Sequence, residues 1–564
     1  MKRQYLRRVH TLAVIFFVQF TLAVSPVTAQ SWLKKATKSV FTLKTFDEAG
    51  SLLGSSNGFF VGEQGEAVSS YAPFKGAASA IVIDPQGNEM PVAFMLGANE
   101  TYDVAKFRVT TKKSVPLAVS QSDETVGNSV WLLPYREQKQ CPEGTVRKAE
   151  TFKDSYAYYT VAINMPEQAV GSPLLNANGE VIGLMQQPTR QNDTLNYAVS
   201  ARFADSLAIN GLSINDPVLR AIHIKKDLPQ SLDQARLTLF MANSSLDSAS
   251  YATLIDDFIE RFPQSVDGYS NRALNLTAAA RYDEAARDME QAIRSADNKD
   301  EAHYAYSRLI FDLLTQRGTD AYQPWTLDKA LAEIEEANRI SPQPIYRQHQ
   351  ASLLYAQQKY DEACNIYQEL THSQLRSAEL FYYAAQCKLM QRDTLAQLAL
   401  LDSAVAIYNR PYLKEAAPFL FARAQARIDA GKYRDAVADL NDYEQLMPTQ
   451  VNDRFYYIRH QADLGGRLFQ QALNDINRAI ELAPDNEFYP SEKASLQIRV
   501  GLYDEAMETA RESIRLRPDY SDGYLFLGLA QCLKGQKDEG VKNLLKAKEL
   551  GDPQADGLIE KYSK

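Results

Sequence analysis

The chain has few of the residues that form covalent or metal cross-links. Its 564 residues include only four cysteines, at Cys141, Cys364, Cys387 and Cys532. Thiols so few and so scattered exclude a disulfide scaffold and a cysteine-based zinc site. The motifs H-E-x-x-H, G-x-x-x-x-G-K, C-x-x-C and G-x-G-x-x-G are also missing, which argues against zinc-protease, P-loop, thiol-redox and dinucleotide chemistry. We therefore expect no cofactor and no metal site.

Histidine is scarcer still in the first half of the chain. The sequence has six histidines, and none lies between Gln30 and Asn210. Hydrolysis through an activated serine requires a general base beside the hydroxyl, most often an imidazole. Residues 30–210 therefore contain no imidazole that could act as this base.

Basic clusters are also absent beyond the first few residues. The formal net charge is -9, whereas non-specific nucleic-acid binding needs a basic surface. We expect no nucleic-acid partner. Hydrophobic residues make up 45% and charged residues 23% of the chain, which is typical of globular domains and not of disordered segments.

The N-terminus has the pattern of a secretory signal. Lys2, Arg3, Arg7 and Arg8 precede an apolar stretch at 10–24, and small residues at 27–29 suit peptidase cleavage before Gln30. The apolar stretch is shorter than the roughly 20 residues that span a bilayer. We predict a signal peptide at 1–29, a periplasmic or extracellular location and no stable membrane span after cleavage. An uncleaved membrane anchor is the alternative.

The hydrophobic pattern divides the remaining chain in two. Residues 30–210 contain short runs with period two, such as 39–44 and 80–83, separated by turn residues. Asn178-Gly179 between two apolar runs predicts a hairpin with a type I′ turn. Many short strands at close spacing predict an all-β barrel or sandwich. Residues 211–230, with two prolines, are the expected linker.

From residue 231 onward the hydrophobic period becomes 3.6, and a block of about 34 residues recurs. The clearest copies start near Val266, Pro344, Ala417, Asp453, Glu487 and Ser521. A small residue stands twenty positions into each copy, at Ala285, Ala363, Ala436, Ala472, Ala506 and Gly540, and the first five have an aromatic residue three positions earlier. Two antiparallel helices need a small residue where they approach closely.

This spacing is that of the tetratricopeptide repeat (TPR). The resemblance predicts an all-α TPR superhelix of about nine helical pairs over 231–554, with a C-terminal tail at 555–564. In such arrays the first helix of each pair lines a concave surface that binds protein or peptide. Counting positions in those helices gives the peptide-groove candidates Phe421, Gln425, Tyr457, Gln461, Ser491, Ser495, Leu525 and Leu529. The alternative is that many of these residues pack between neighbouring repeats.

The front half resembles the trypsin-like serine proteases, especially the Deg-type enzymes. The resemblance rests on five stretches in the family's order: GSSNGFFV at 54–61, GEAVSSYAP at 65–73, YDVAKF at 102–107, QAVGSPL at 168–174 and LNYAVS at 195–200. It implies a double β-barrel over 30–210, and hence a multidomain protein with an all-β front and an all-α rear.

The resemblance also locates the catalytic positions. It places Ala72 where the family has its histidine, Val170 where it has its serine, and Asp103 where it has its carboxylate. These three are vestigial triad positions, and we assign no catalytic residue. Ser172, two residues after the lost nucleophile, is best explained as a small turn residue.

The sequence therefore predicts an exported scaffold or adaptor that binds proteins through its repeats and carries an inactive protease-like domain, a pseudoprotease. The alternative is a serine endopeptidase with a non-standard active site.

Overall fold

We analysed a computed structural model of the chain. It describes residues 29–133, 135, 141–153, 155–166, 168–188, 195–318 and 320–563. The predicted signal peptide, apart from its last residue, lies outside these ranges. The chain falls into two compact units, one ending at Asn275 and the other starting at Leu276, and each is described by itself.

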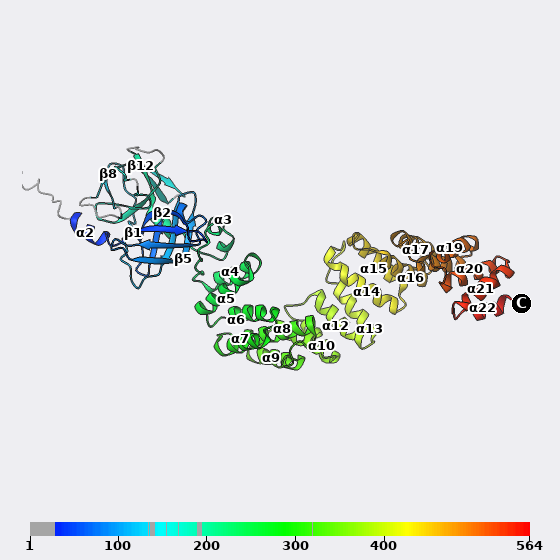
Figure 1. Ribbon diagram of the computed structural model, residues 1–564. Coiled ribbons are helices and arrows are strands. Elements are labelled where there is room, and N and C mark those ends of the chain that lie inside the picture. Colours follow the sequence, from blue (N-terminus) through cyan, green and yellow to red (C-terminus); the bar gives the residue numbers. More distant parts are fainter. Residues whose placement is uncertain are drawn as a thin grey trace, which may run out of the picture. The chain divides into compact units, whose positions relative to one another are not determined.

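The first unit contains two closed antiparallel barrels of six strands each (Figure 1). The first barrel has the strand order β1-β2-β3-β6-β5-β4 and consists of β1 (Val40–Phe46), β2 (Leu52–Phe60), β3 (Glu66–Ser69), β4 (Ser79–Ile83), β5 (Glu89–Asn99) and β6 (Val104–Val109). The second has the order β10-β11-β12-β9-β8-β7 and consists of β7 (Ser129–Leu132), β8 (Glu143–Phe152), β9 (Tyr156–Ala162), β10 (Pro173–Leu175), β11 (Val181–Met185) and β12 (Leu195–Ser200). The predicted double barrel is confirmed.

The β10–β11 hairpin forms where it was predicted, but its turn is of another type. Gly179 has φ +77°, whereas Asn178 does not have the positive φ that a type I′ turn requires. Instead Asn176 organises the loop, because its Oδ1 accepts from the backbone N–H groups of Asn178 and Glu180. The hairpin therefore has a longer loop with glycine in the left-handed position.

Each barrel buries its own apolar core. Aromatic rings fill the first barrel, where Phe41 lies 5.0 Å from Phe60 and Phe74 lies 5.1 Å from Phe107 between ring centroids. The second barrel encloses Tyr159 and aliphatic residues. A third cluster, which includes Phe59 of β2 and Phe203, joins residues of both barrels. This cluster fixes the two barrels against each other. It therefore also fixes the walls of the cleft between them.

Short helices border the barrels. They are α2 (Ala29–Ala36), η1 (Ala72–Phe74), η2 (Ala201–Ser206), η3 (Ser213–Asn215) and α3 (Pro217–Arg220). The expected linker is extensively bonded within the first unit. Met95 of β5 donates its N–H to the Lys225 carbonyl at 2.8 Å, and Arg261 forms an ion pair with Asp227 at 2.6 Å. The first unit therefore extends past residue 230 and includes the first helices of the all-α region.

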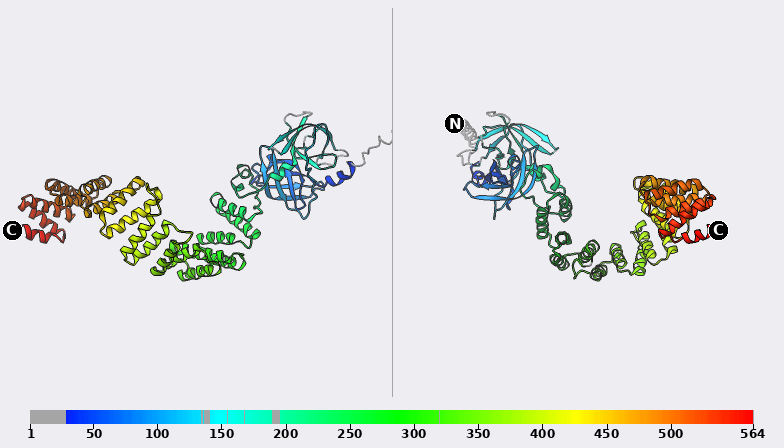
Figure 2. Two further views of the ribbon diagram at one scale, coloured as in Figure 1. Left: turned by 180° about the vertical axis from the view of Figure 1, so that it is seen from behind. Right: turned by 45° about the vertical axis from the view of Figure 1, so that its right-hand side comes forward.

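In the described chain, the all-α region has nineteen helices, in agreement with the predicted solenoid. They are α4 (Leu232–Ser245), α5 (Ser248–Arg261), α6 (Val266–Ala278), α7 (Tyr282–Ser295), α8 (Lys299–Arg317), α9 (Leu327–Ile340), α10 (Pro344–Ala356), α11 (Tyr360–Leu370), α12 (Ala378–Met390), α13 (Thr394–Val405), α14 (Ala417–Asp429), α15 (Tyr433–Leu446), α16 (Asp453–Gly465), α17 (Phe469–Leu482), α18 (Phe488–Arg499), α19 (Tyr503–Leu516), α20 (Ser521–Leu533), α21 (Lys537–Glu549) and α22 (Ala555–Tyr562). Figure 2 shows the helices of the second unit following one another in sequence order. Residues 555–562, expected to be part of a tail, form α22, and Ala555 is fully buried.

The small residues of the repeat lie where two helices meet. The five alanines at this position are all fully buried. In the last copy a Cβ added at Gly540 would lie 2.4 Å from Cys532 Sγ and 2.7 Å from the Gly528 carbonyl oxygen. Glycine is required there because α20 and α21 approach too closely for alanine. Among the described residues, none of the helices is both long and apolar enough to cross a membrane.

A buried charge network joins α16 to α17. Arg459 donates to both carboxylate oxygens of Asp475, at 2.7 and 2.8 Å. Asp463, only 1% exposed, lies beside this pair. Burial and, to a smaller extent, the neighbouring Asp475 charge raise the pKa of Asp463 to about 7.

This raised pKa predicts a pH-dependent stability of the repeats. In the unfolded chain Asp463 loses its proton near pH 4, whereas in the folded chain it keeps the proton up to about pH 7. The folded state therefore loses stability as the pH rises through this window. The Asp463→Asn variant has no proton to lose at this position, so it should not show this loss of stability. Its thermal unfolding midpoint, measured by circular dichroism at 222 nm, should exceed that of the unmodified chain. The excess should be larger at pH 7.5 than at pH 4.5.

The exposed Asp435 of α15 offers a matched control. Asp435→Asn should leave the difference between the two pH values unchanged. Equal effects of the two substitutions would contradict a buried, protonated Asp463.

Candidate functional site

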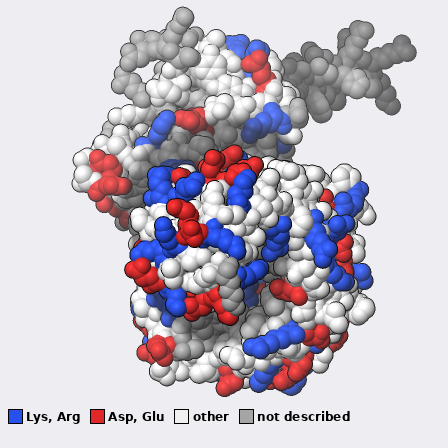
Figure 3. Space-filling model, turned by 90° about the vertical axis from the view of Figure 1, so that its right-hand side faces the viewer, with Lys and Arg blue, Asp and Glu red and all other residues white. Residues whose placement is uncertain are grey.

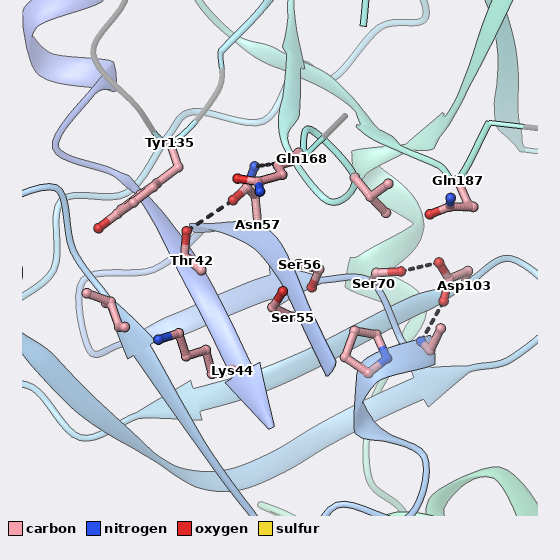
Figure 4. A pocket seen from close by; sticks show the side chains of 14 residues that line it. Thr42, Lys44, Ser55, Ser56, Asn57, Ser70, Asp103, Tyr135, Gln168 and Gln187 are labelled. Atoms are coloured by element: carbon pink, nitrogen blue, oxygen red, sulfur yellow. Dashed lines mark hydrogen bonds between the residues drawn. The ribbon is translucent and has the colours of Figure 1, made fainter. Parts of the chain in front are cut away.

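A polar cavity of about 650 Å³ lies between the two barrels (Figure 4). Its lining includes Ala72, Asp103 and Val170. These three residues come from η1, from the turn between β5 and β6, and from the loop before β10. The structure thus brings together the three positions that the sequence alignment selected.

Asp103 is held in place by its neighbours in the first barrel. Its Oδ1 accepts from the backbone N–H of Ala72 at 2.7 Å, and its Oδ2 accepts a short hydrogen bond from the Ser70 hydroxyl. Its backbone has φ +48°, a left-handed conformation that aspartate tolerates better than most residues. Burial raises the pKa of Asp103, while the two hydrogen bonds oppose the increase. The carboxylate thus bonds the backbone where the imidazole would stand in an active enzyme.

Asn57 of β2 connects the first barrel to the loop that carries Val170. Its Nδ2 donates to the Gln168 carbonyl at 2.6 Å and to Ser172 Oγ at 3.0 Å, and its backbone N–H donates to the Val170 carbonyl at 2.8 Å. The Thr42 hydroxyl completes the network by donating to Asn57 Oδ1 at 3.2 Å. Figure 4 shows Thr42, Asn57 and Gln168 joined in this way across the cavity. The network fixes the loop to β2.

The backbone amides next to Val170 are already occupied. Ala169 donates to the Pro166 carbonyl at 3.1 Å and Gly171 donates to the Met185 carbonyl at 2.8 Å. Gly171 has φ +81°, and a Cβ there would lie 2.1 Å from the Asn57 carbonyl oxygen. These two hydrogen bonds and the close approach of Gly171 to Asn57 hold the loop around Val170 in its conformation.

Ser172 is fully buried and does not line the cavity. Its Oγ accepts from Asn57, and its backbone N–H donates to the Ala169 carbonyl at 3.1 Å. This placement agrees with the interpretation of Ser172 as a small turn residue. Among the described residues that line the cavity there is no histidine.

A second cavity, of about 470 Å³, lies in the second unit. Three of the predicted groove residues line it: Gln425 on α14, and Tyr457 and Gln461 on α16. The sequence analysis missed Tyr382, Gln386 and Leu389 of α12, which line it too. They are the fifth, ninth and twelfth residues counted from Ala378, the same positions that Tyr457 and Gln461 occupy in α16. The longer exit loop of that repeat obscured the correspondence.

This second cavity combines amide and aromatic side chains. Gln461 donates to Glu492 at 2.9 Å, and burial raises the pKa of the Glu492 carboxyl. Tyr457 packs 5.0 Å from Phe488, and burial raises its pKa to about 12. The phenol is therefore neutral and able to donate a hydrogen bond at physiological pH.

The remaining groove candidates lie outside this cavity. Phe421 packs against Tyr443 at 5.1 Å. Ser491 is fully buried and Leu525 is 2% exposed, so both are part of the packing between helices. Ser495 and Leu529 are half-buried.

Parts of the chain are similar to known proteins. Residues 56–184 match a family model described as a trypsin-like peptidase domain. The small glutamine-rich tetratricopeptide repeat-containing protein 2 of Saccharomyces cerevisiae is 27% identical over 95 residues, which are 17% of this chain and 28% of that protein. A crystal structure of the Rv3671c protease from M. tuberculosis, in its active form, aligns at 15% identity with a TM-score of 0.29, over 36% of this chain and 89% of that one.

The chain joins a trypsin-like domain to TPR-like repeats. The cavity between the barrels thus lies in the trypsin-like domain, and the amide-lined cavity lies in the repeat region. Sequence motifs located Ala72, Asp103 and Val170. The stretch at 54–61 contains Asn57 but did not signal its role, because its partners Gln168 and Ser172 lie more than a hundred residues away along the chain.

The role of Asp103 leads to a stability prediction. Asp103→Ala removes the acceptor for Ala72 and Ser70 and leaves alanine in a left-handed conformation, so we expect a loss of about 2 kcal/mol or more in unfolding free energy. Hydrogen exchange of peptides from β3, η1 and β6 measures the effect in the trypsin-like domain alone.

Asp103→Asn is the matched variant, because it keeps the shape and the preference for positive φ but removes the charge. It should lose less stability than Asp103→Ala. If neither variant changes exchange in these elements, Asp103 does not hold the cleft as described.

Proposed function

We propose that this protein is an exported scaffold that binds other proteins through its TPR-like repeats, and that its trypsin-like domain does not cleave peptide bonds. The observation that carries the proposal is the composition of the cleft. Asp103 is present, but the other two triad positions, which line the same cavity, are occupied by Ala72 and Val170. In an active serine protease the carboxylate orients the histidine that activates the serine. Without that histidine and serine, the Asp103 carboxylate has no catalytic group to orient.

The chemistry of the cleft supports binding better than cleavage. Attack on a peptide carbonyl requires a nucleophile and a group that accepts its proton. The methyl of Ala72 and the isopropyl group of Val170 can do neither. The hydroxyl, amide and ammonium groups that line the cavity, including Lys44, Ser55 and Gln187, can form hydrogen bonds with an extended peptide.

The repeat region supplies a second binding surface. Gln386, Gln425 and Gln461 line one cavity together with two tyrosines. A carboxamide both donates and accepts, so it can match the N–H and C=O groups of a peptide backbone. On the face drawn in Figure 3, the basic and acidic side chains of the described residues are interspersed, which is consistent with a protein partner and not with a nucleic acid.

Export rests on the N-terminal sequence. The basic, apolar and small-residue segments at 1–29 occur in the order that a secretory signal requires. The periplasmic or extracellular location is therefore part of the proposal.

One observation favours the alternative of a serine endopeptidase with a non-standard site. The Ser70 hydroxyl donates to Asp103, so a hydroxyl and a carboxylate adjoin in the cleft. However, Ser70 is only 1% exposed, and its hydroxyl is turned to Asp103 and not to an imidazole. The same contact suits a carboxylate that holds β3 and the turn before β6 together.

The absence of cleavage is directly testable. Purified protein lacking 1–29 should give no labelling with a serine-reactive fluorophosphonate and no release of peptides from casein, because no serine is activated. Active trypsin, labelled in parallel, confirms the reagent. Labelling that disappears in Ser172→Ala or Ser70→Ala would establish a catalytic serine and refute the proposal.

The repeat cavity gives a second test. Peptides selected from a random display library on the full chain should lose about tenfold in affinity for the double variant Gln386→Ala/Gln425→Ala, because each lost amide contact contributes about 0.5–1.5 kcal/mol. Fluorescence anisotropy of the labelled peptides measures the change.

The control is Gln368→Ala/Gln445→Ala, which removes two exposed glutamines from the second helices α11 and α15. It should leave affinity unchanged. Equal losses in the two double variants, or no loss in the first, would show that peptides bind elsewhere on the chain.

A further inference from the structure

A third cavity lies within the first unit, where residues 209–227 meet α4 and α5. Its volume is about 680 Å³, within the usual range for small-ligand sites. We call it the junction pocket. It is separate from the cleft between the barrels, because the two cavities share no lining residue.

The acidic groups of the junction pocket are already engaged. Asp257 forms an ion pair with Lys225 at 2.6 Å, and Asp227 forms one with Arg261 at 2.6 Å. Asp247 caps α5 by accepting from the backbone N–H groups of Ala249 and Ser250 at 3.0 Å. Glu48 lies 3.4 Å from His223 Nδ1. Two of the four carboxylates are therefore paired with cations, while Asp247 is bonded at the start of α5 and Glu48 lies beside an imidazole.

Two cations of the pocket have no such partner. The half-buried Lys226 ammonium donates to the Ile222 carbonyl, and among the described residues no carboxylate lies within ion-pair distance of it. The same holds for the exposed Arg220. Burial lowers the pKa of Lys226 to about 8, which is the expected response of an ammonium that lacks a counter-charge. A bound anion would restore that charge.

The rest of the wall combines aliphatic side chains with polar ones such as Asn210, Ser213 and Thr253. Six branched side chains line the pocket: Ile209, Ile214, Ile222, Ile224, Leu246 and Leu254. Such a wall binds a hydrocarbon body, while polar groups at a few points fix its orientation. The pocket thus offers an apolar wall and two uncompensated positive charges.

We propose that the junction pocket binds a carboxylate carried on an aliphatic body, with Lys226 and Arg220 as the counter-charges. Two sources share this chemistry: a free medium-chain fatty acid, and a peptide that ends in an aliphatic residue with a free C-terminal carboxylate. The site lies outside the repeat cavity, so it does not depend on the function proposed above.

Titration calorimetry of the full chain lacking 1–29 tests the proposal with matched probes. Decanoate is compared with decanamide, and a hexapeptide ending in leucine carboxylate is compared with its C-terminal amide. We expect at least one carboxylate to bind about tenfold or more tightly than its neutral partner, since a charge-assisted hydrogen bond is lost in the amide. Which carboxylate binds identifies the source.

Lys226→Met and Arg220→Gln should each weaken binding of that carboxylate several-fold and leave the neutral probe unaffected. Arg220 is exposed, so its variant tests the site even if Lys226→Met destabilises the fold. Lys112→Met, at an exposed lysine of the same unit, is the control and should bind as the unmodified chain does. The proposal is refuted if neither carboxylate binds at millimolar concentration, if acid and amide bind equally, or if Lys112→Met weakens binding as much as the other two variants.

Discussion

The cleft of the trypsin-like domain depends on Asn57. One side chain and its backbone N–H provide three hydrogen bonds, to Gln168, Val170 and Ser172, between a strand of the first barrel and a loop of the second. These bonds hold Val170 in the cavity wall and keep Ser172 buried. Buried polar networks of this kind stabilise one arrangement when every member is satisfied. The cleft is therefore a fixed, polar surface.

The repeat region depends on a different constraint, the close approach of paired helices. Fully buried alanines at one repeat position, and glycine in the last copy, allow this approach. Buried arginine–aspartate pairs recur on neighbouring repeats, with Arg423 bonded to Asp439 and Arg459 bonded to Asp475. Pairing in this way limits the cost of burying each charge. The first helices are thus held firmly enough to present the glutamines of α12, α14 and α16 to one cavity.

The three cavities differ in chemistry, which suggests a division of tasks. The cleft between the barrels is polar, the repeat cavity is rich in amide and aromatic groups, and the junction pocket pairs an aliphatic wall with uncompensated cations. The junction pocket lies where α4 and α5 meet residues 209–227. A ligand there would contact both elements of the first unit, so its binding would stabilise their association by linkage.

The sequence by itself determined the two classes of fold, the repeat positions and the three residues of the barrel domain that were expected to share one cleft. Period-two and 3.6-residue patterns are local, and the positions of Ala72, Asp103 and Val170 follow from short motifs in a fixed order. Only the tertiary structure decided which side chains share a cavity. Asn57 and Gln168 are 111 residues apart, Ser491 and Leu525 are buried by neighbouring helices, and the unpaired state of Lys226 depends on which carboxylates fold up beside it. Such contacts arise from packing between distant segments, and no local pattern encodes them.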